Sequence, residues 1–195
     1  MQLLRSHQRF REFATSSTLG WSFFFRNSRA AGQLVFILSK FSKLNTLNLG
    51  LNIVSDYKDV YFTSKDGLRL YARDYDAALP SSKLPIICIH GLTRNSADFN
   101  ELAPLLAKQG RRVIAVDVRG RGRSQHAHQV AHYHPWVYAN DIVSLAAQLG
   151  IHRAVFIGTS MGGLITMTLA LRKSKLIAAA VLNDVGPKLS QKGLD

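Results

Sequence analysis

A serine stands between two glycines where an apolar run gives way to a run with helical spacing. The stretch reads AVFIGTSMGGLITMTLAL, residues 154–171, and centres on Gly158, Ser160 and Gly162. In the spacing G-x-S-x-G the serine occupies a sharp strand-to-helix turn, and a larger residue two positions before or after it would collide across that turn. The following helix directs its N-terminal N–H groups to the same place. The pattern predicts that Ser160 is a nucleophile; the alternative is a tight glycine turn with an incidental serine.

A histidine and a glycine follow a second apolar run, LPIICI. In the sequence HGLT, residues 90–93, Gly91 lets the backbone turn with its amides facing inward. The N–H groups of Leu92 and Met161 can then point at one oxygen and form an oxyanion hole for a tetrahedral intermediate. We expect His90 to shape this loop through backbone hydrogen bonds rather than to act as a base, because it precedes the serine in chain order.

Three arginines alternate with glycines after a third apolar run, RVIAV. This stretch, DVRGRGRS, covers residues 117–124 and begins at Asp117. It resembles a phosphate site, yet it lacks both the G-x-G-x-x-G spacing and a P-loop lysine. We therefore expect a structural turn whose arginines are solvated or paired with nearby acids.

The elements that must position these residues alternate along the chain. Asp66-Gly67 joins two β-rich runs and predicts a hairpin. Apolar runs and helical patterns then alternate: strands are expected at 84–91, 111–120, 152–158 and 176–184, and helices at 95–109, 136–149 and 160–174. This order predicts an α/β protein with a mostly parallel sheet of about six strands and helices on both faces. Ligands bind at the carboxyl ends of such strands, which is where the three motifs lie.

Composition limits the function classes. The 195 residues suit one domain, and the net charge of +13 raises the question of an anionic partner. No helix-turn-helix, zinc-finger or RNA-binding pattern accompanies that charge, so we expect no nucleic-acid partner. No apolar run is long enough to span a bilayer. The single cysteine, Cys88, lies in an apolar run and is expected to be a buried reduced thiol, which fits the cytoplasm.

Residues 1–56 differ from the rest of the chain. They hold seven Arg or Lys residues against Glu12 and Asp56 and show no sustained period. We expect this basic leader to lie outside the domain at 57–195. Its composition is typical of a mitochondrial or other organelle address; the alternatives are a disordered leader or an upstream extension.

The motifs together resemble one known family. HGLTRNSADF, DVRGRGRS and GTSMGG, in this order, are similar to the α/β-hydrolase fold superfamily, and VFIGTSMGGLITM and VLNDVGP resemble its ester- and lactone-cleaving members. The resemblance covers about residues 57–195. It implies a hydrolase of carboxylic esters or related acyl bonds in a small-molecule substrate, with no cofactor. It also implies that Ser160 is the nucleophile, that Leu92 and Met161 supply oxyanion N–H groups, and that Asp117 is structural.

The remaining members of the catalytic triad are the open question. The family's acid follows the seventh strand or sometimes the sixth, so Asp184 is the candidate; the alternative is that it caps a turn. The order in this fold is serine, acid, histidine. No histidine follows Ser160, because the seven stand at positions 7, 90, 126, 128, 132, 134 and 152. A serine hydroxyl is a weak nucleophile without a base.

Two interpretations follow. The chain is either the N-terminal portion of a serine hydrolase, lacking the late acid and histidine, or a catalytically incomplete hydrolase-like protein with a binding or regulatory role. The family's sheet has eight strands, so six would leave the run LIAAAVL as an open edge to which another chain could pair. The four histidines in HAHQVAHYH, residues 126–134, do not have zinc-ligand spacing, and we expect no metal.

Overall fold

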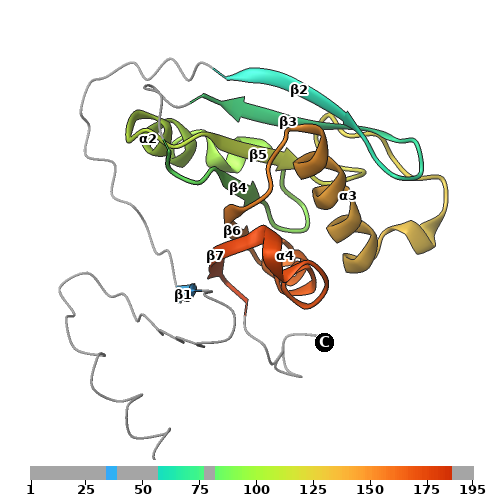
Figure 1. Cartoon of the computed structure of the whole chain (residues 1–195). Coiled ribbons are helices and arrows are strands. Elements are labelled where there is room, and N and C mark those ends of the chain that lie inside the picture. Colours follow the sequence, from blue (N-terminus) through green and yellow to red (C-terminus); the bar gives the residue numbers. More distant parts are fainter. Residues whose placement is uncertain (1–33, 39–56, 77–81, 186–195) are drawn as a thin grey trace, which may run out of the picture.

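The strands form one sheet in the computed structural model, which describes residues 57–76 and 82–185 together with the backbone of 34–38 (Figure 1). The strand order is β1-β7-β6-β4-β5-β3-β2. The strands are β1 (Leu34–Leu38), β2 (Lys58–Thr63), β3 (Arg69–Tyr75), β4 (Ile86–Ile89), β5 (Val113–Asp117), β6 (Ala154–Thr159) and β7 (Ile177–Asn183). The hairpin predicted at Asp66-Gly67 is confirmed: β2 and β3 are antiparallel, and Gly67 has a φ of 83°. Strands β5, β4, β6, β7 and β1 run parallel to one another, so the mostly parallel sheet is confirmed as well.

One expected helix is divided in two. Residues 95–109 form a 3-10 turn η1 (Ser96–Phe99), followed by helix α2 (Leu102–Lys108). The Asn95 side chain caps η1 by accepting from the N–H of Ala97 at 2.9 Å. Pro104 explains the division, because a continuous helix would need a proline N–H to reach the carbonyl of residue 100, whereas in α2 the proline falls in the first turn.

The other helical segments follow the predicted order. Helices α3 and α4 lie where helical patterns were expected, with short 3-10 turns before α3 and after α4. They are η2 (Val130–His132), α3 (Pro135–Gln148), α4 (Met161–Arg172) and η3 (Ser174–Leu176). None of the helices within 57–76 and 82–185 has the length and apolar character needed to cross a bilayer.

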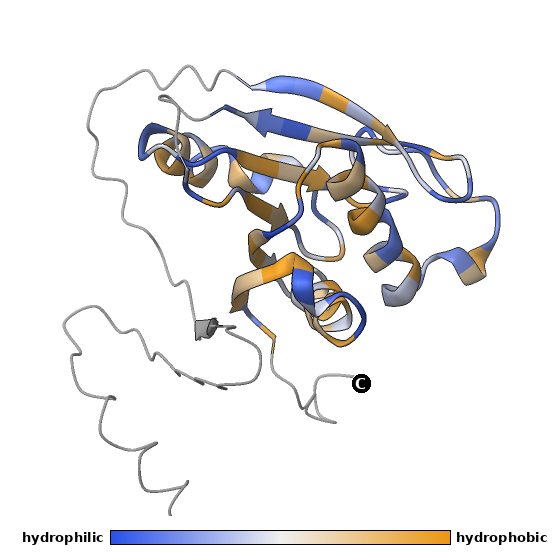
Figure 2. Ribbon diagram, viewed as in Figure 1, coloured by the Kyte–Doolittle hydropathy of each residue, from blue (hydrophilic) through white to orange (hydrophobic). Residues whose placement is uncertain are grey.

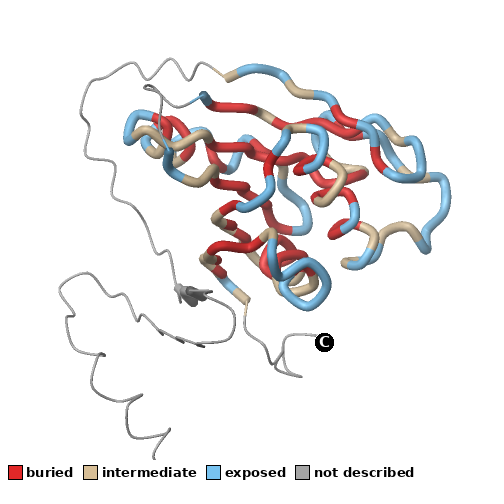
Figure 3. The backbone as a smooth tube through the Cα atoms, in the orientation of Figure 1, coloured by how far each residue is buried: buried red, intermediate tan, exposed pale blue. Residues whose placement is uncertain are grey.

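The core lies on both faces of the sheet. On β4, Ile87 and Ile89 face the side covered by α3 and α4, whereas Ile86 and Cys88 face the side covered by α2 (Figures 1 and 3). Apolar colour is concentrated on the central strands (Figure 2). Cys88 is a fully buried free thiol, as predicted, and burial raises its pKa. Helices on both faces are thus confirmed.

The edge expected to be open is occupied. Strand β1 pairs in parallel with β7, from Leu34 opposite Ala179 to Leu38 opposite Asn183. The expectation of an open edge at β7 is therefore wrong for this structure, and the sheet has seven strands instead of six. The LVFIL sequence suits a strand in a parallel pair, which needs no alternation of apolar and polar residues. The proposed targeting role of the leader concerns residues mostly outside the described ranges.

Candidate active site

Ser160 occupies a strained turn between β6 and α4. Its φ is 50° and its ψ is −110°, a conformation that non-glycine residues rarely adopt. The turn is held from both sides: the N–H of Ser160 donates to the carbonyl of Asn183 at 2.8 Å, and the N–H of Gly163 donates to the carbonyl of Ser160 at 2.9 Å. The serine lies between the carboxyl end of β6 and the N-terminus of α4, and it is only partly buried.

The glycines around Ser160 leave no room for a side chain. A Cβ on Gly158 would lie 2.4 Å from the carbonyl oxygen of Gly162, and a Cβ on Gly162 would lie 2.1 Å from that of Ile89. Such contacts are far inside van der Waals distance. A larger residue at either glycine would therefore collide in this turn, as the G-x-S-x-G spacing predicts. The small size of Gly162 also lets α4 pack directly against the end of β4.

His90 is fixed by hydrogen bonds at both ring nitrogens. It is fully buried; its Nε2 accepts from the N–H of Val118 at 3.1 Å, and its Nδ1 lies 2.6 Å from the carbonyl oxygen of Gly91. Because Val118 can only donate, the ring proton is on Nδ1 and is donated to Gly91. Burial lowers the pKa of His90, which favours this neutral form. Both nitrogens are occupied by backbone groups, in agreement with the predicted loop-shaping contacts.

The loop after β4 lies beside the serine. The position that a Cβ on Gly91 would take is 3.8 Å from Cβ of Ser160 and 3.8 Å from Cγ of Arg94. The Gly91 carbonyl, held by His90, also accepts from the N–H of Arg94 at 3.2 Å. In a trans peptide the N–H of Leu92 points opposite to that carbonyl, so these two bonds fix its direction. Met161, the other residue expected to supply an N–H, is the first residue of α4 and is buried.

Asp117 ties three segments together at the end of β5. Its buried carboxylate accepts from the N–H of Ser96 at 2.6 Å and from the N–H of Arg123 at 2.7 Å. Its own carbonyl accepts from Ser124 Oγ at 2.6 Å. A Cβ on Gly122 would lie 2.0 Å from this carboxylate. These contacts hold the end of β5 to residue 96 and to the arginine-glycine loop.

Two arginines of the DVRGRGRS loop pair with acids, as expected. The guanidinium of Arg119 is buried between Asp141 and Asp66, and its hydrogen bonds hold the pKa of Asp66 well below its usual range. Arg123 pairs with Asp59 at 2.7 Å. The third arginine behaves differently, since Arg121 donates from Nε to the carbonyl of Leu92 at 3.1 Å.

Asp184 follows β7 directly. It is exposed, and its φ of 53° places it in the left-handed region, which non-glycine residues rarely adopt. It is adjacent in the chain to Asn183, whose carbonyl accepts from Ser160. No recorded ion pair within the described ranges includes Asp184. Sequence reasoning missed Asn183, whose side-chain oxygen is buried without a partner among the described residues; its position at the carboxyl end of a strand was the available signal.

The histidines of residues 126–134 do not converge. His134 caps α3 by accepting from the N–H of Trp136 at 3.3 Å, and His132 lies 3.2 Å from Asp66. Within the part of the chain that the structure describes, no three His, Cys, Asp or Glu side chains form a group that could hold a metal ion.

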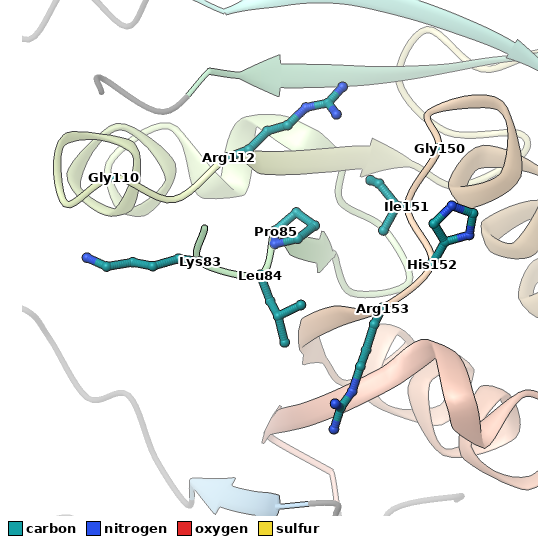
Figure 4. A pocket seen from close by; sticks show the side chains of 9 residues that line it. All are labelled: Lys83, Leu84, Pro85, Gly110, Arg112, Gly150, Ile151, His152 and Arg153. Carbon is teal, nitrogen blue, oxygen red and sulfur yellow. The ribbon is translucent and has the colours of Figure 1, made fainter. Parts of the chain in front are cut away.

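Two cavities differ in their relation to Ser160. One, of about 650 Å³, begins directly after the Gly91 loop and is lined by Thr93, Arg94, Asn95, Ala97, Asp98, Asn100 and Glu101. The other, of about 430 Å³, is lined by residues that precede β4, β5 and β6, so it lies at the opposite edge of the sheet (Figure 4). There the side chains of Lys83, Arg112 and Arg153 point away from one another, and Arg112 pairs with Asp74 at 2.6 Å. The first cavity therefore follows the Gly91 loop in the chain, and neither cavity is lined by Ser160.

The fold and the strained turn at Ser160 define a class of protein. Residues 85–192 match the family described as the α/β hydrolase fold, and the chain belongs to it. This is a hydrolase family.

Individual relatives are similar over part of their length. An α/β hydrolase structure from Novosphingobium aromaticivorans is 50% identical, with a TM-score of 0.67, over 72% of this chain and 48% of that one. The 3-hydroxybutyrate-oligomer hydrolase of Cupriavidus necator is 40% identical over 116 residues, which are 60% of this chain and 39% of the relative. The sn-1-specific diacylglycerol lipase ABHD11 of Mus musculus is 36% identical over 115 residues, 58% of this chain and 35% of the relative. The chain thus spans less than half the length of these relatives.

Proposed function

We propose that the chain carries the nucleophile and the oxyanion hole of a serine hydrolase acting on carboxylic esters. The observation that carries this proposal is the strained conformation of Ser160, φ 50° at a strand-to-helix elbow, beside the Gly91 loop. Strain of this kind persists where surrounding structure enforces it, and it is concentrated at functional sites. The names of two relatives, an oligomer hydrolase and a diacylglycerol lipase, both concern ester substrates.

The reaction proceeds in two halves. The oxygen of Ser160 attacks the ester carbonyl carbon while a base takes the hydroxyl proton, and the carbonyl oxygen becomes an oxyanion. The C–O bond to the alcohol then breaks, the alcohol leaves with that proton, and an acyl-serine remains. Water attacks the acyl-serine in the same way, releasing the acid and returning the proton to Ser160.

The oxyanion is stabilised by two fixed N–H groups. The Leu92 N–H is oriented because His90 and Arg94 hold the carbonyl of the same peptide, and the Met161 N–H opens α4, where the helix dipole favours negative charge. Donors held in place before the reaction cost no reorganisation as charge develops.

The base lies outside the described residues in this proposal. His90 is occupied at both nitrogens, and no histidine follows Ser160. We assign the late acid and histidine to sequence beyond position 195, with Asp184 as a weaker candidate for the acid. The partial coverage of the relatives supports this assignment.

A second candidate function is a hydrolase-like binding or regulatory protein without turnover. It rests on the observation that residues 161–195 contain no histidine. It predicts a folded chain whose serine reacts no faster than an ordinary surface hydroxyl.

Fluorophosphonate labelling of the longer protein that this proposal assumes, with the late acid and histidine present, tests the first function against the second. We expect mass spectrometry to find the adduct on Ser160, and Ser160→Ala to abolish it. Ser144→Ala, on helix α3, is the matched control and keeps the label. A longer protein that supplies the late acid and histidine, is folded by circular dichroism and is still unlabelled contradicts the nucleophile assignment and leaves the binding function.

A further inference from the structure

Arg121 links the arginine-glycine loop to the loop after β4. Its Nε donates to the carbonyl of Leu92 at 3.1 Å, and its Nη1 donates to the carbonyl of Arg119 at 3.0 Å and to the hydroxyl of Tyr138 at 3.1 Å. The guanidinium also lies 5.6 Å from the ring centroids of Tyr133 and Tyr138. Five contacts therefore define its position.

The charge of Arg121 has no acidic partner. Arg119 and Arg123, two residues to either side, both form ion pairs, but none of the ion pairs recorded within 57–76 and 82–185 includes Arg121. Aromatic rings hold a cation without neutralising it. A net positive charge is thus held at the Leu92 carbonyl, one residue after Gly91, which borders Ser160.

The side chain of Leu92 does little to hold its own backbone. It is 58% exposed, so packing provides only weak restraint. The peptide before Leu92 is held by His90 and Arg94 at the Gly91 carbonyl, and the peptide after it is held by Arg121. Both backbone dihedrals of Leu92 are therefore fixed by hydrogen bonds from outside.

From these contacts we infer that Arg121 is a positioning residue for the oxyanion hole, which sets the Leu92 N–H against Ser160 and adds positive charge beside it. The inference rests on the proposed function. It gives the DVRGRGRS motif a role beyond a structural turn, because one of its three arginines acts on the loop that binds the oxyanion.

The chemistry of the site requires arginine rather than any cation. Three acceptors are engaged by a planar group with fixed donor directions, whereas an ammonium is a point charge on a flexible stem. Arg121→Lys therefore keeps the charge and loses the geometry, and Arg121→Met loses both.

The test measures the rate of fluorophosphonate labelling of Ser160 in the longer protein that supplies the late acid and histidine. We expect Arg121→Met to slow labelling by about tenfold to a hundredfold, less than the loss of an oxyanion donor itself, and Arg121→Lys to fall between it and the wild type. Arg123→Met is the matched control and labels at the wild-type rate, because Arg123 contacts Asp59 and Tyr61 instead of the Leu92 loop. Tyr138→Phe, which removes one acceptor and keeps the buried ring, slows labelling by a smaller factor.

A spectroscopic measurement separates positioning from general stability. The carbonyl ¹³C resonance of Leu92 reports its hydrogen bond, and we expect it to shift in Arg121→Met and not in Arg123→Met. If Arg121→Met labels at the wild-type rate, the inference is overturned while the nucleophile assignment stands. If the wild type is not labelled at all, the proposed function fails, and the catalytic role of Arg121 fails with it.

Discussion

His90 joins the ends of two neighbouring strands by donating to the Gly91 carbonyl at 2.6 Å and accepting from the Val118 N–H at 3.1 Å. Only the neutral Nδ1–H form of the ring can make both bonds. The loop that borders Ser160 and the loop that carries the arginines are thus coupled through one buried side chain.

Replacing His90 should affect both stability and reactivity. His90→Phe leaves the Gly91 carbonyl and the Val118 N–H without this partner, and an unsatisfied buried polar group costs about 1–3 kcal/mol. We expect urea unfolding to show a loss of that size and fluorophosphonate labelling of Ser160 to slow. His152→Phe, at an exposed histidine, is the control. If a folded His90→Phe chain is labelled at the wild-type rate, His90 does not position the oxyanion loop.

The same histidine should give a defined pH dependence of stability. Burial holds the pKa of His90 below its ordinary value of 6.5, so below that pH the unfolded chain binds a proton that the folded chain does not. The part of the free energy of unfolding that depends on neutral His90 is therefore constant above about pH 7. It is lost as pH falls from about 6.5 toward the pKa of His90 in the folded chain. We expect His90→Gln to flatten the decline measured by urea unfolding, and His152→Gln to leave it unchanged. Parallel curves for wild type and His90→Gln would show that the decline does not come from His90.

Substitution of Gly162, in the turn around Ser160, can be compared with substitution of Gly91, which has space around it. A Cβ on Gly162 would lie 2.1 Å from the carbonyl oxygen of Ile89, whereas a Cβ on Gly91 would meet nothing closer than 3.8 Å. We expect Gly162→Ala to lower the free energy of unfolding by at least about 1–3 kcal/mol through overpacking. Gly91→Ala should keep the fold and slow labelling, because its methyl group contacts Ser160. Equal stability of the two variants would mean that α4 is not packed against β4 in solution.

Much of the site could be predicted because its signals are local. G-x-S-x-G fixes a strand-to-helix turn in which Gly158 and Gly162 lie close together, within two positions of Ser160. The ends of apolar runs marked the carboxyl edge of the sheet, so His90, Asp117 and Ser160 were correctly placed at one edge. Pro104 was also a local signal, and its missing N–H accounts for the divided helix that the periodicity alone did not predict.

The features that escaped prediction depend on contacts between distant segments. The pairing of β1 with β7 joins residues more than a hundred positions apart, and the LVFIL stretch carries no period that names a partner. Arg121 is chemically identical to Arg119 and Arg123, and only the tertiary arrangement sends it to a carbonyl instead of a carboxylate. Asn183 was missed for a similar reason, because its carbonyl accepts from the N–H of Ser160 at the end of the neighbouring strand β6.

Removing the segment that contains β1 should expose the edge of β7. A variant lacking residues 1–56 loses the strand that pairs with Ile177–Asn183, whereas one lacking residues 1–33 keeps it. An unpaired, apolar edge strand associates with other chains. We therefore expect the shorter variant to self-associate in light scattering and to unfold at lower urea, and the longer variant to match the wild type. A leader that served only as an address would leave association and unfolding unchanged in both variants. If both variants match the wild type, β1 contributes nothing to the sheet.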